Sequence, residues 1–218
     1  MAATSRKRAR TEPTPPTIDK PKVFNDAVLG HVELHPCCVA VVDTPQFQRL
    51  RGLKQLGPTE YVYPAAGHTR FAHSLGVSFL AGKLVEKLSH QVSPPLHITE
   101  REILCVKLAG LCHDLGHGPL SHTFEKFVRM RRPHLKWRHE HASAALFAKV
   151  VRDQKVAAVF GRYDLTEDDV HFVQELIFGD KSDAPSSWKW RGLPPHKHFL
   201  FEIVSNHRNG IDVDKFDY

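Results

Sequence analysis

Hydrophobic side chains recur along much of this chain at the spacing of α-helices. Within residues 70–89, His73, Val77, Leu80 and Leu84 stand at positions i, i+4, i+7 and i+11, which places them on one face of an amphipathic helix. A face that carries three aliphatic side chains is the one that packs against a core. The pattern therefore predicts a long helix with a histidine turned toward the interior.

A second helix is predicted downstream, with a clear start and a buried face. Residues 99–102, Thr-Glu-Arg-Glu, form a capping box, in which the first and last side chains bind backbone N–H groups at a helix start. The apolar positions that follow share one face: Ile103, Leu104, Leu108, Leu111 and Cys112. His113 and Asp114 are therefore expected at the C-terminal end of a buried helix.

The remaining patterns also favour helices. Helical periodicity covers roughly residues 138–152, 166–178 and 199–206, with two shorter pieces in 36–55. Other segments read as a strand or turn at 32–34, extended chain at 61–64 and a loop at 179–198. Because few segments alternate and no repeat is found, the predicted fold class is mainly α.

The two pieces in residues 36–55 are separated by a recognisable restart signal. Asp43 or Thr44 can cap the second piece, and Pro45 suits the first turn of a helix. The sequence does not decide which of these two residues is the cap.

Residues 1–21 differ from the rest of the chain. They carry the basic cluster 6–10, Arg-Lys-Arg-Ala-Arg, and several prolines, with almost no large apolar side chains. Such a segment cannot offset the entropy of ordering, so we expect a disordered basic tail before an ordered domain at 22–218. The cluster is typical of a nuclear-import signal, the alternative being an ordinary solvated basic tail. Nuclear localisation is predicted, with the cytoplasm as a second compartment.

Composition narrows the class of protein. Hydrophobic residues make up 41% and charged residues 25% of the 218 positions, as in soluble globular proteins. No apolar run approaches the roughly 18 residues of a membrane span, and the N-terminus lacks the apolar core of a signal peptide. No membrane association is expected. The net charge of +6 favours anionic partners, such as nucleotides or nucleic acid.

The cysteines favour a reducing compartment. Four are present, Cys37, Cys38, Cys105 and Cys112, and no pair has Cys-x-x-Cys spacing. The last two lie seven positions apart on a predicted helix, or about 10 Å along its axis, which is too far for a disulfide. The chain is therefore expected to keep free thiols.

One segment holds the densest set of candidate metal-binding side chains. It is residues 111–122, Leu-Cys-His-Asp-Leu-Gly-His-Gly-Pro-Leu-Ser-His. Three of the chain's 16 histidines and one aspartate fall within ten positions. Imidazole nitrogen and carboxylate oxygen at this density suit a borderline divalent metal. The glycines allow a backbone or a ligand to approach closely.

Two further features support a metal site. His73 lies on the inward face of its helix, and an acidic cluster, Asp212, Asp214 and Asp217, lies near the C-terminus. Considered separately, His73 is more simply explained as a core histidine with its hydrogen bonds made within the protein. The acidic cluster alone is more simply explained as a solvent-exposed turn. Together with His113 and Asp114, they predict a His/Asp site assembled from separate helices. Two histidines and two aspartates suit Fe, Zn, Mn or Ni.

These stretches resemble the HD-domain superfamily of metal-dependent phosphohydrolases, whose pattern is H…HD…D. The closest resemblance is to the vertebrate deoxynucleoside triphosphate (dNTP) triphosphohydrolases that carry a sterile alpha motif before the HD domain. It covers about residues 22–218 and is carried by residues 43–51, 71–77, 109–119, 203–206 and 209–215. It implies a helical bundle with a metal site at its centre.

The resemblance also implies a role for each matching residue. The metal ligands would be His73, His113, Asp114 and Asp214. The catalytic residues would be His122, which protonates the leaving 5′ oxygen, with His117, His139 and Glu125, the last in a place where the family usually has aspartate. Substrate contacts would come from Gln55, Leu56, Arg70, Lys215 and Tyr218.

The implied reaction is hydrolysis of a dNTP to a deoxynucleoside and tripolyphosphate. Mg²⁺ would accompany the nucleotide phosphates. The implied consequence is a smaller dNTP pool, which restricts viral reverse transcription and so contributes to antiviral defence.

The same resemblance implies allosteric control by GTP and dNTP activators. The half-site that binds guanine nucleotide would comprise Lys22, Val23, Asn25, Asp43, Gln48 and Arg51. The chemistry is consistent, because Asp43 can accept from guanine N1–H and N2–H₂ and Arg51 can donate to O6 and N7. Asp43 can serve as a helix cap as well.

Relatives of this kind form homotetramers and are longer. Here only 21 residues precede the HD-like region, and the chain stops four residues after Asp214. We therefore expect the N-terminal part of a larger catalytic core, without the sterile alpha motif.

A different class of function stays open. Residues 129–138, Arg-Met-Arg-Arg-Pro-His-Leu-Lys-Trp-Arg, are strongly basic and can neutralise phosphates. The alternative is thus a catalytically silent module that binds nucleotides or single-stranded nucleic acid. The ordinary reading of this stretch is a solvated loop.

Overall fold

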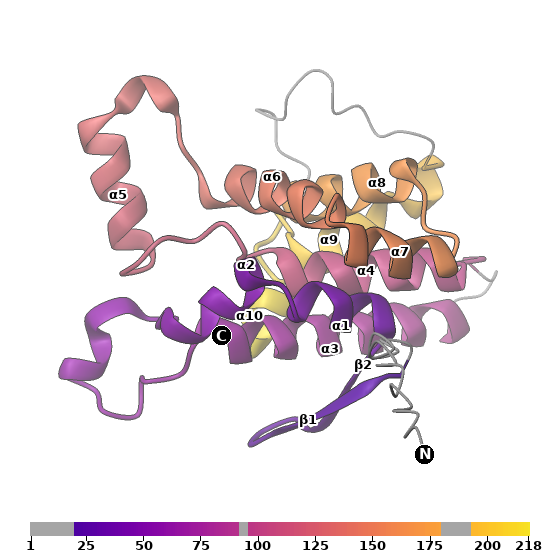
Figure 1. The fold of residues 1–218 in the computed structure, drawn as a ribbon, viewed down its shortest axis with the longest axis horizontal. Coiled ribbons are helices and arrows are strands. Elements are labelled where there is room, and N and C mark those ends of the chain that lie inside the picture. The colour runs from indigo at the N-terminus through magenta and orange to yellow at the C-terminus, as the bar shows by residue number, and fades with distance from the viewer. Residues whose placement is uncertain (1–19, 92–95, 180–192) are drawn as a thin grey trace, which may run out of the picture.

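The computed structural model describes residues 20–91, 96–179 and 193–218. At its centre, helix α3 (Arg70–Gln91) packs against α4 (Glu100–Cys112), which packs against α8 (Glu167–Phe178) (Figure 1). Helix α6 (His139–Val151) covers α8. The predicted mainly α fold is confirmed.

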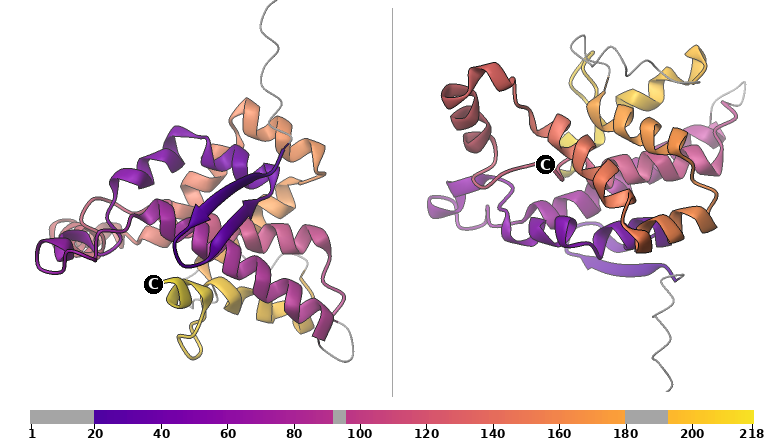
Figure 2. Two further views of the ribbon diagram at one scale, coloured as in Figure 1. Left: turned by 90° about the horizontal axis from the view of Figure 1, so that it is seen from below. Right: turned by 45° about the horizontal axis from the view of Figure 1, so that its top comes forward.

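Shorter elements surround these helices. An antiparallel hairpin of β1 (Lys22–Asp26) and β2 (Gly30–Leu34), with Phe24 opposite Val32, lies along the outside of the bundle next to α3 (Figure 2). The other helices are α1 (Pro36–Val42), α2 (Pro45–Gln48), α5 (His122–Arg131), α7 (Gln154–Arg162), α9 (Phe201–Val204) and α10 (Val213–Asp217). The 3₁₀ helices are η1 (Arg49–Gly52), η2 (Gly57–Tyr61), η3 (Pro133–Leu135) and η4 (Pro195–Leu200).

The two long helices match the hydrophobic pattern. In α3, His73 and Val77 are buried, and Leu80 and Leu84 are partly buried against the core. In α4, the predicted apolar face is buried throughout, and His113 is the C-cap residue of the helix. The placement of the two histidines at the interior is thus set by ordinary amphipathic periodicity.

Helix starts follow the predicted caps. Thr99 and Glu102 form the capping box of α4, with the Thr99 N–H donating to Glu102 Oε2 at 2.7 Å. Thr44, rather than Asp43, caps α2, because its Oγ1 accepts from the Phe47 N–H and Pro45 opens the helix. Asp43 instead ends α1.

Two local predictions are wrong. Residues 61–64 are not extended, because the N–H groups of Val62 and Tyr63 donate to Thr59 O and close tight turns after η2. Residues 195–198, predicted as loop, lie in η4; residues 180–192 of that predicted loop lie outside the described residues. Helices α5, α7 and α10 were not predicted; each has ten residues or fewer, so each offers too few turns for a helical repeat to stand out.

The basic tail falls almost wholly outside the described part of the chain, so its expected disorder and import signal stay predictions. Within the described ranges, none of the helices has both the length and the apolar composition needed to cross a bilayer.

All four cysteines are free and buried. Burial raises the pKa of the Cys37 and Cys38 thiols to about 12. Because the thiolate is the reactive species, we expect a disulfide reagent such as DTNB to label the native protein very slowly and to label four thiols in denaturant. Fast labelling of one thiol in the native protein would contradict this packing.

Asp169 joins the start of α8 to α4, and its loss is expected to destabilise the fold. Its carboxylate accepts from the Thr166 N–H at 2.6 Å and from Arg101 Nε at 2.7 Å. Asp169→Ala should lower the free energy of unfolding by about 1–3 kcal/mol, because a helix-start bond and a charged pair disappear together. Urea denaturation at pH 7 measures this, with the exposed Asp168→Ala as control.

The same variant predicts a pH dependence. Burial favours a raised pKa of Asp169, but hydrogen bonds from Thr166 and Arg101 outweigh burial and lower the pKa. A carboxyl whose pKa is lower in the folded state stabilises the fold above its unfolded pKa, about 3.9, and loses that effect as pH falls through the folded value. The stability difference between parent and Asp169→Ala should therefore shrink in acid. A constant difference down to about pH 2 would contradict it.

Candidate metal centre and active-site pocket

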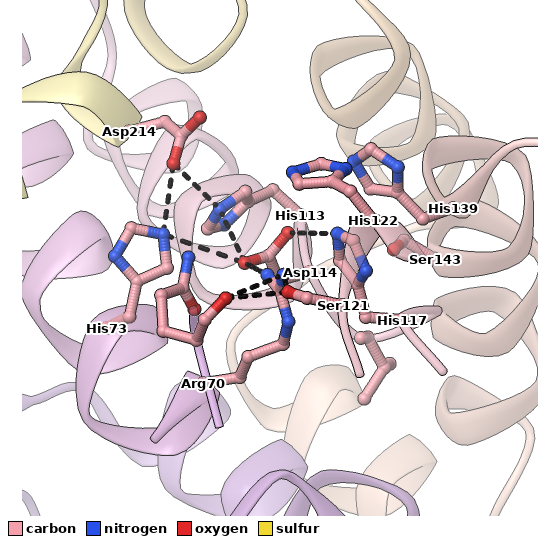
Figure 3. Close-up of polar contacts among 12 residues, drawn as sticks. Arg70, His73, His113, Asp114, His117, Ser121, His122, His139, Ser143 and Asp214 are labelled. Atoms are coloured by element: carbon pink, nitrogen blue, oxygen red, sulfur yellow. Dashed lines mark hydrogen bonds and ion pairs between the residues drawn. The ribbon is translucent and has the colours of Figure 1, made fainter. Parts of the chain in front are cut away.

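Three side chains from separate helices converge at the centre of the bundle (Figure 3). His73 lies on α3, His113 directly follows α4, and Asp214 lies on α10. Asp214 Oδ1 is 2.9 Å from His73 Nε2 and 3.4 Å from His113 Nε2. One ligand atom from each residue lies within 4.8 Å of the others, which is close enough to share a metal ion.

Hydrogen bonds on the far side of both rings orient them for a metal. His113 Nδ1 donates to Gly110 O at 2.7 Å, and His73 Nδ1 donates to Asp217 Oδ2 at 2.7 Å. Both bonds leave Nε2 facing Asp214, as in metal sites where the second ring nitrogen is held by an oxygen. Among the described residues, His113 Nε2 is buried without a hydrogen-bond partner. The donor set therefore fits a divalent metal.

Asp114 lies beside these three residues and borders a second cluster. Its Oδ2 is 3.4 Å from His113 Nε2 and 3.6 Å from His73 Nε2, while its Oδ1 is 3.4 Å from His117 Nε2. Burial favours a raised pKa of Asp114, but the neighbouring histidines and Arg70 outweigh burial and hold the pKa well below its usual range. Asp114 thus remains a carboxylate available for coordination.

Arg70 is expected from the resemblance to contact phosphate, but its side chain is buried. It is only 1% exposed, and its guanidinium donates to Asp114 Oδ2 and to Ser121 Oγ. Its charge is thus held beneath the metal site, where it fixes and compensates the aspartate. A contact between Arg70 and phosphate stays a prediction.

The second cluster contains the other three predicted histidines. His117, His122 and His139 form a compact group, with the rings of His117 and His139 stacked at 4.0 Å (Figure 3). His139 Nδ1 donates to Glu125 Oε2 at 2.9 Å. The glutamate therefore reaches its histidine, and its other oxygen accepts from Arg129.

Burial and neighbouring charge set the protonation of this cluster. Burial lowers the pKa of His117 to about 2, so this ring is neutral at pH 7. Burial, followed by the charges of His139 and Arg70, also lowers the pKa of His122. His122 is the most accessible of the three, with 57% of its side chain exposed, and so is the one that can meet a ligand.

A cavity of about 560 Å³ opens onto both clusters. Its walls include His113, His122, His139, Asp214, Lys215 and Tyr218. Lys215 is about half exposed and bonded to Asp212 at 2.9 Å, so its ammonium lies at the rim of the cavity. The Tyr218 ring lies 6.3 Å from that of His73. A cavity of this size accommodates a small ligand with phosphate groups.

Gln55 and Leu56 approach the site from another side. Gln55 is 2% exposed, and its backbone carbonyl oxygen accepts from Ser121 Oγ at 2.6 Å. Neither residue lines the cavity beside Lys215 and Tyr218.

The backbone beside Ser121 is unusual. Leu120 and Ser121 have φ of 61° and 57°, values that non-glycine residues rarely adopt. The Ser121 bonds to Arg70 and Gln55 hold this conformation in place. The sequence did not point to Ser121, because glycine is the residue type that usually indicates a positive φ and a serine does not.

Gly116 and Gly118 do allow the close approach expected of them. A Cβ at Gly116 would lie 2.6 Å from the Ala142 carbonyl carbon of α6, and one at Gly118 would overlap the Phe124 ring. The Gly116 N–H donates to Ser143 Oγ at 2.8 Å. The loop that carries the histidines is thus pressed against α6.

The residues predicted to bind guanine nucleotide lie around β1, α1 and η1. Lys22 Nζ donates to Asp43 Oδ2 at 2.6 Å, and Arg51 Nε donates to Gln48 Oε1 at 2.8 Å. Val23 and Asn25 are exposed on β1. Their role in nucleotide binding stays a prediction.

Arg49, which sequence reasoning missed, lies between Gln48 and Arg51. It donates to Leu115 O at 2.6 Å and to His117 O at 2.8 Å. It therefore connects η1 directly to the histidine-bearing loop.

The family model for the HD domain matches residues 70–182, which include both clusters except for Asp214. The chain belongs to the HD-domain family. HD domains are metal-dependent, so the family and the His73–His113–Asp214 geometry agree on a metal site.

Curated relatives of this HD-domain chain carry a more specific name. Deoxynucleoside triphosphate triphosphohydrolase SAMHD1 is 52% identical in Gallus gallus over 206 residues and 51% identical in Homo sapiens over 205 residues. These matches cover 93% and 92% of this chain but 33% of each relative. The SAMHD1 homolog of Dictyostelium discoideum is 42% identical over 90% of this chain and 35% of its own length. The chain thus spans about a third of the length of these relatives.

Proposed function

We propose that this HD domain hydrolyses dNTPs to deoxynucleoside and tripolyphosphate in a metal-dependent reaction. The observation that carries the proposal is the meeting of a metal-binding trio and a histidine cluster on the two sides of Asp114, beside one cavity. The names of relatives about half identical to the chain support the choice of substrate.

Four residues would hold the metal: His73, His113, Asp114 and Asp214. A divalent cation there supplies a Lewis acid for phosphoryl oxygens and lowers the pKa of a coordinated water. Arg70 keeps Asp114 ionised and in place. Lys215, at the rim, binds phosphate charge as the substrate enters.

His122 donates the proton that the reaction needs. As the water oxygen bonds to the α-phosphorus and releases a proton to solvent, the bond from phosphorus to the 5′ oxygen breaks and a proton passes from His122 to that oxygen. Solvent then reprotonates His122. The lowered pKa of free His122 is offset by substrate, because a bound triphosphate brings negative charge that favours the imidazolium form. His139, held by Glu125, and neutral His117 fix the ring positions around it.

The same resemblance supports proposals about the metal, the regulation and the location of the protein. The metal is Fe, Zn, Mn or Ni, with Mg²⁺ on the nucleotide phosphates. Guanine nucleotide and dNTP bind the half-site around Asp43 and Arg51 and promote a homotetramer. The protein acts in the nucleus and limits the dNTP pool, and thereby viral reverse transcription.

One assay tests the activity. The purified chain is incubated with dGTP, GTP and Mg²⁺ or Mn²⁺, and the products are separated by chromatography. Deoxyguanosine and tripolyphosphate in equal amounts are expected. Absence of product from a chain that carries stoichiometric metal would refute the activity for this chain.

A second candidate function rests on the arm formed by α5 and η3, residues 122–138. It carries six Lys and Arg residues against a single acid, Glu125, and α5 projects away from the helical layers (Figures 1 and 2). Phe127 is 55% exposed beside these cations. Cations interleaved with an aromatic ring suit single-stranded nucleic acid.

Binding of a fluorescent single-stranded oligonucleotide at several salt concentrations tests this candidate. Replacing Arg131 and Arg132 with glutamine should weaken binding and reduce the salt dependence by about one unit of slope per lost phosphate contact. Unchanged binding would exclude the arm as the nucleic-acid site.

A further inference from the structure

We propose that Asp217 is the positioning residue for His73 as a metal ligand, and that Gly76 is glycine in order to admit the Asp217 carboxylate. This inference rests on the metal site of the proposed function. It concerns two residues to which neither the H…HD…D pattern nor the family match gives a role.

The first support is the hydrogen bond behind His73. Asp217 Oδ2 accepts from His73 Nδ1 at 2.7 Å, while His73 Nε2 faces Asp214 Oδ1 at 2.9 Å. The His73 side chain is 0% exposed and that of Asp217 only 15%, so little water competes for the bond. A carboxylate in this position fixes the tautomer, holds the ring plane and makes Nε2 a stronger donor to a metal.

The second support is the surface of α3 against which Asp217 packs. Gly76 lies three positions after His73, on the same side of the helix. A Cβ at Gly76 would overlap Asp217 Oδ1 and would lie 2.6 Å from Asp217 Cγ. Glycine inside a helix is destabilising relative to alanine. The space it leaves is filled by the Asp217 carboxylate, which accepts from His73 Nδ1.

Two single variants of the full chain test the pair. Asp217→Asn keeps the shape but removes the charge and lets the amide favour the wrong imidazole tautomer. Gly76→Ala keeps every ligand and Asp217 itself, but displaces the carboxylate. Each should raise the dissociation constant for Zn²⁺ or Mn²⁺ about 10–100-fold, the usual effect of losing such a partner. Calorimetric titration of the metal-free protein measures this.

The chain offers matched controls. Asp168→Asn changes an exposed aspartate in α8, and Gly161→Ala changes a helical glycine whose Cβ would have no neighbour within 4 Å. Both should bind metal as the parent does. Thermal unfolding of the metal-free proteins separates a positioning role from a structural one, since Asp217→Asn should unfold close to the parent.

Two further readouts distinguish a positioning role. In zinc-loaded protein labelled with ¹⁵N-histidine, the His73 Nδ1–H should give a downfield resonance that shifts upfield in Asp217→Asn. In a double-variant cycle, adding Gly76→Ala to Asp217→Ala should cost no further affinity, because both changes remove the same contact.

The outcomes are separable. Parent-like affinity and an unshifted resonance in Asp217→Asn would overturn the role of Asp217. Parent-like affinity in Gly76→Ala, or additive losses in the double variant, would overturn the role of Gly76. A parent chain that binds no metal would overturn the metal site and this inference together, and is recognised because every protein in the set then fails to bind.

Discussion

Replacing His113 with alanine is expected to abolish stable metal binding and, with it, the proposed dNTP hydrolysis. Its Nε2 lies 3.4 Å from both Asp114 Oδ2 and Asp214 Oδ1 and is buried among the other ligands. Loss of a direct ligand should exceed the ~10–100-fold loss of affinity that follows removal of an outer partner. Metal content after dialysis, by mass spectrometry, measures the first effect, and release of tripolyphosphate measures the second.

His134→Ala is the matched control for this experiment. His134 is an exposed histidine of η3, far along the arm from the metal site. It should retain the metal content of the parent. If His113→Ala retained it as well, the central assignment of the metal ligands would be wrong.

The second large effect is expected at His122, the proposed proton donor. His122→Asn should lower kcat by about 10²–10⁴, because the leaving oxygen would depart without a proton from a positioned acid. Metal held by the His73–His113–Asp214 trio should not change, since His122 is not part of that trio. Steady-state kinetics together with metal analysis on the same preparation check both halves.

Leaving-group chemistry provides a sharper control for His122. A substrate analogue whose 5′ leaving group needs no protonation, such as a nitrophenyl ester, should be hydrolysed by His122→Asn at nearly the parent rate. Equal losses for both substrates would show that His122 acts in binding or folding and not as the acid.

Periodicity was sufficient to predict two of the helices that build the metal site, α3 and α4, but not α10. The apolar stripes of α3 and α4 fix which side of each helix is buried, and His73 and His113 follow from that placement. Asp214 could be proposed as a ligand because it lies in an acidic cluster near the C-terminus and matches the last position of the H…HD…D pattern. Its distance of 2.9 Å from His73 depends on how α10 packs against α3, which local sequence does not specify.

The contacts that sequence reasoning missed are all tertiary. The resemblance predicts that Arg70 contacts phosphate, and nothing in the local sequence shows that Arg70 is also buried and paired with Asp114. The left-handed backbone at Leu120 and Ser121 is fixed by bonds to residues more than 50 positions away. Helix α5 was also not predicted, although Phe124, Phe127 and Val128 stand at helical spacing within its ten residues.

His73 and Asp214 are separated by 141 positions in the chain. A metal held by both links positions separated by nearly two thirds of these 218 residues and acts as a reversible cross-link in place of a covalent one. A metal that binds the folded chain and not the unfolded one stabilises the fold by about 2.7 kcal/mol when its free concentration is about 100 times the dissociation constant. During synthesis this link can form only after α10 has left the ribosome. Bound metal would then add to the stability of the newly made chain before any nucleotide is encountered.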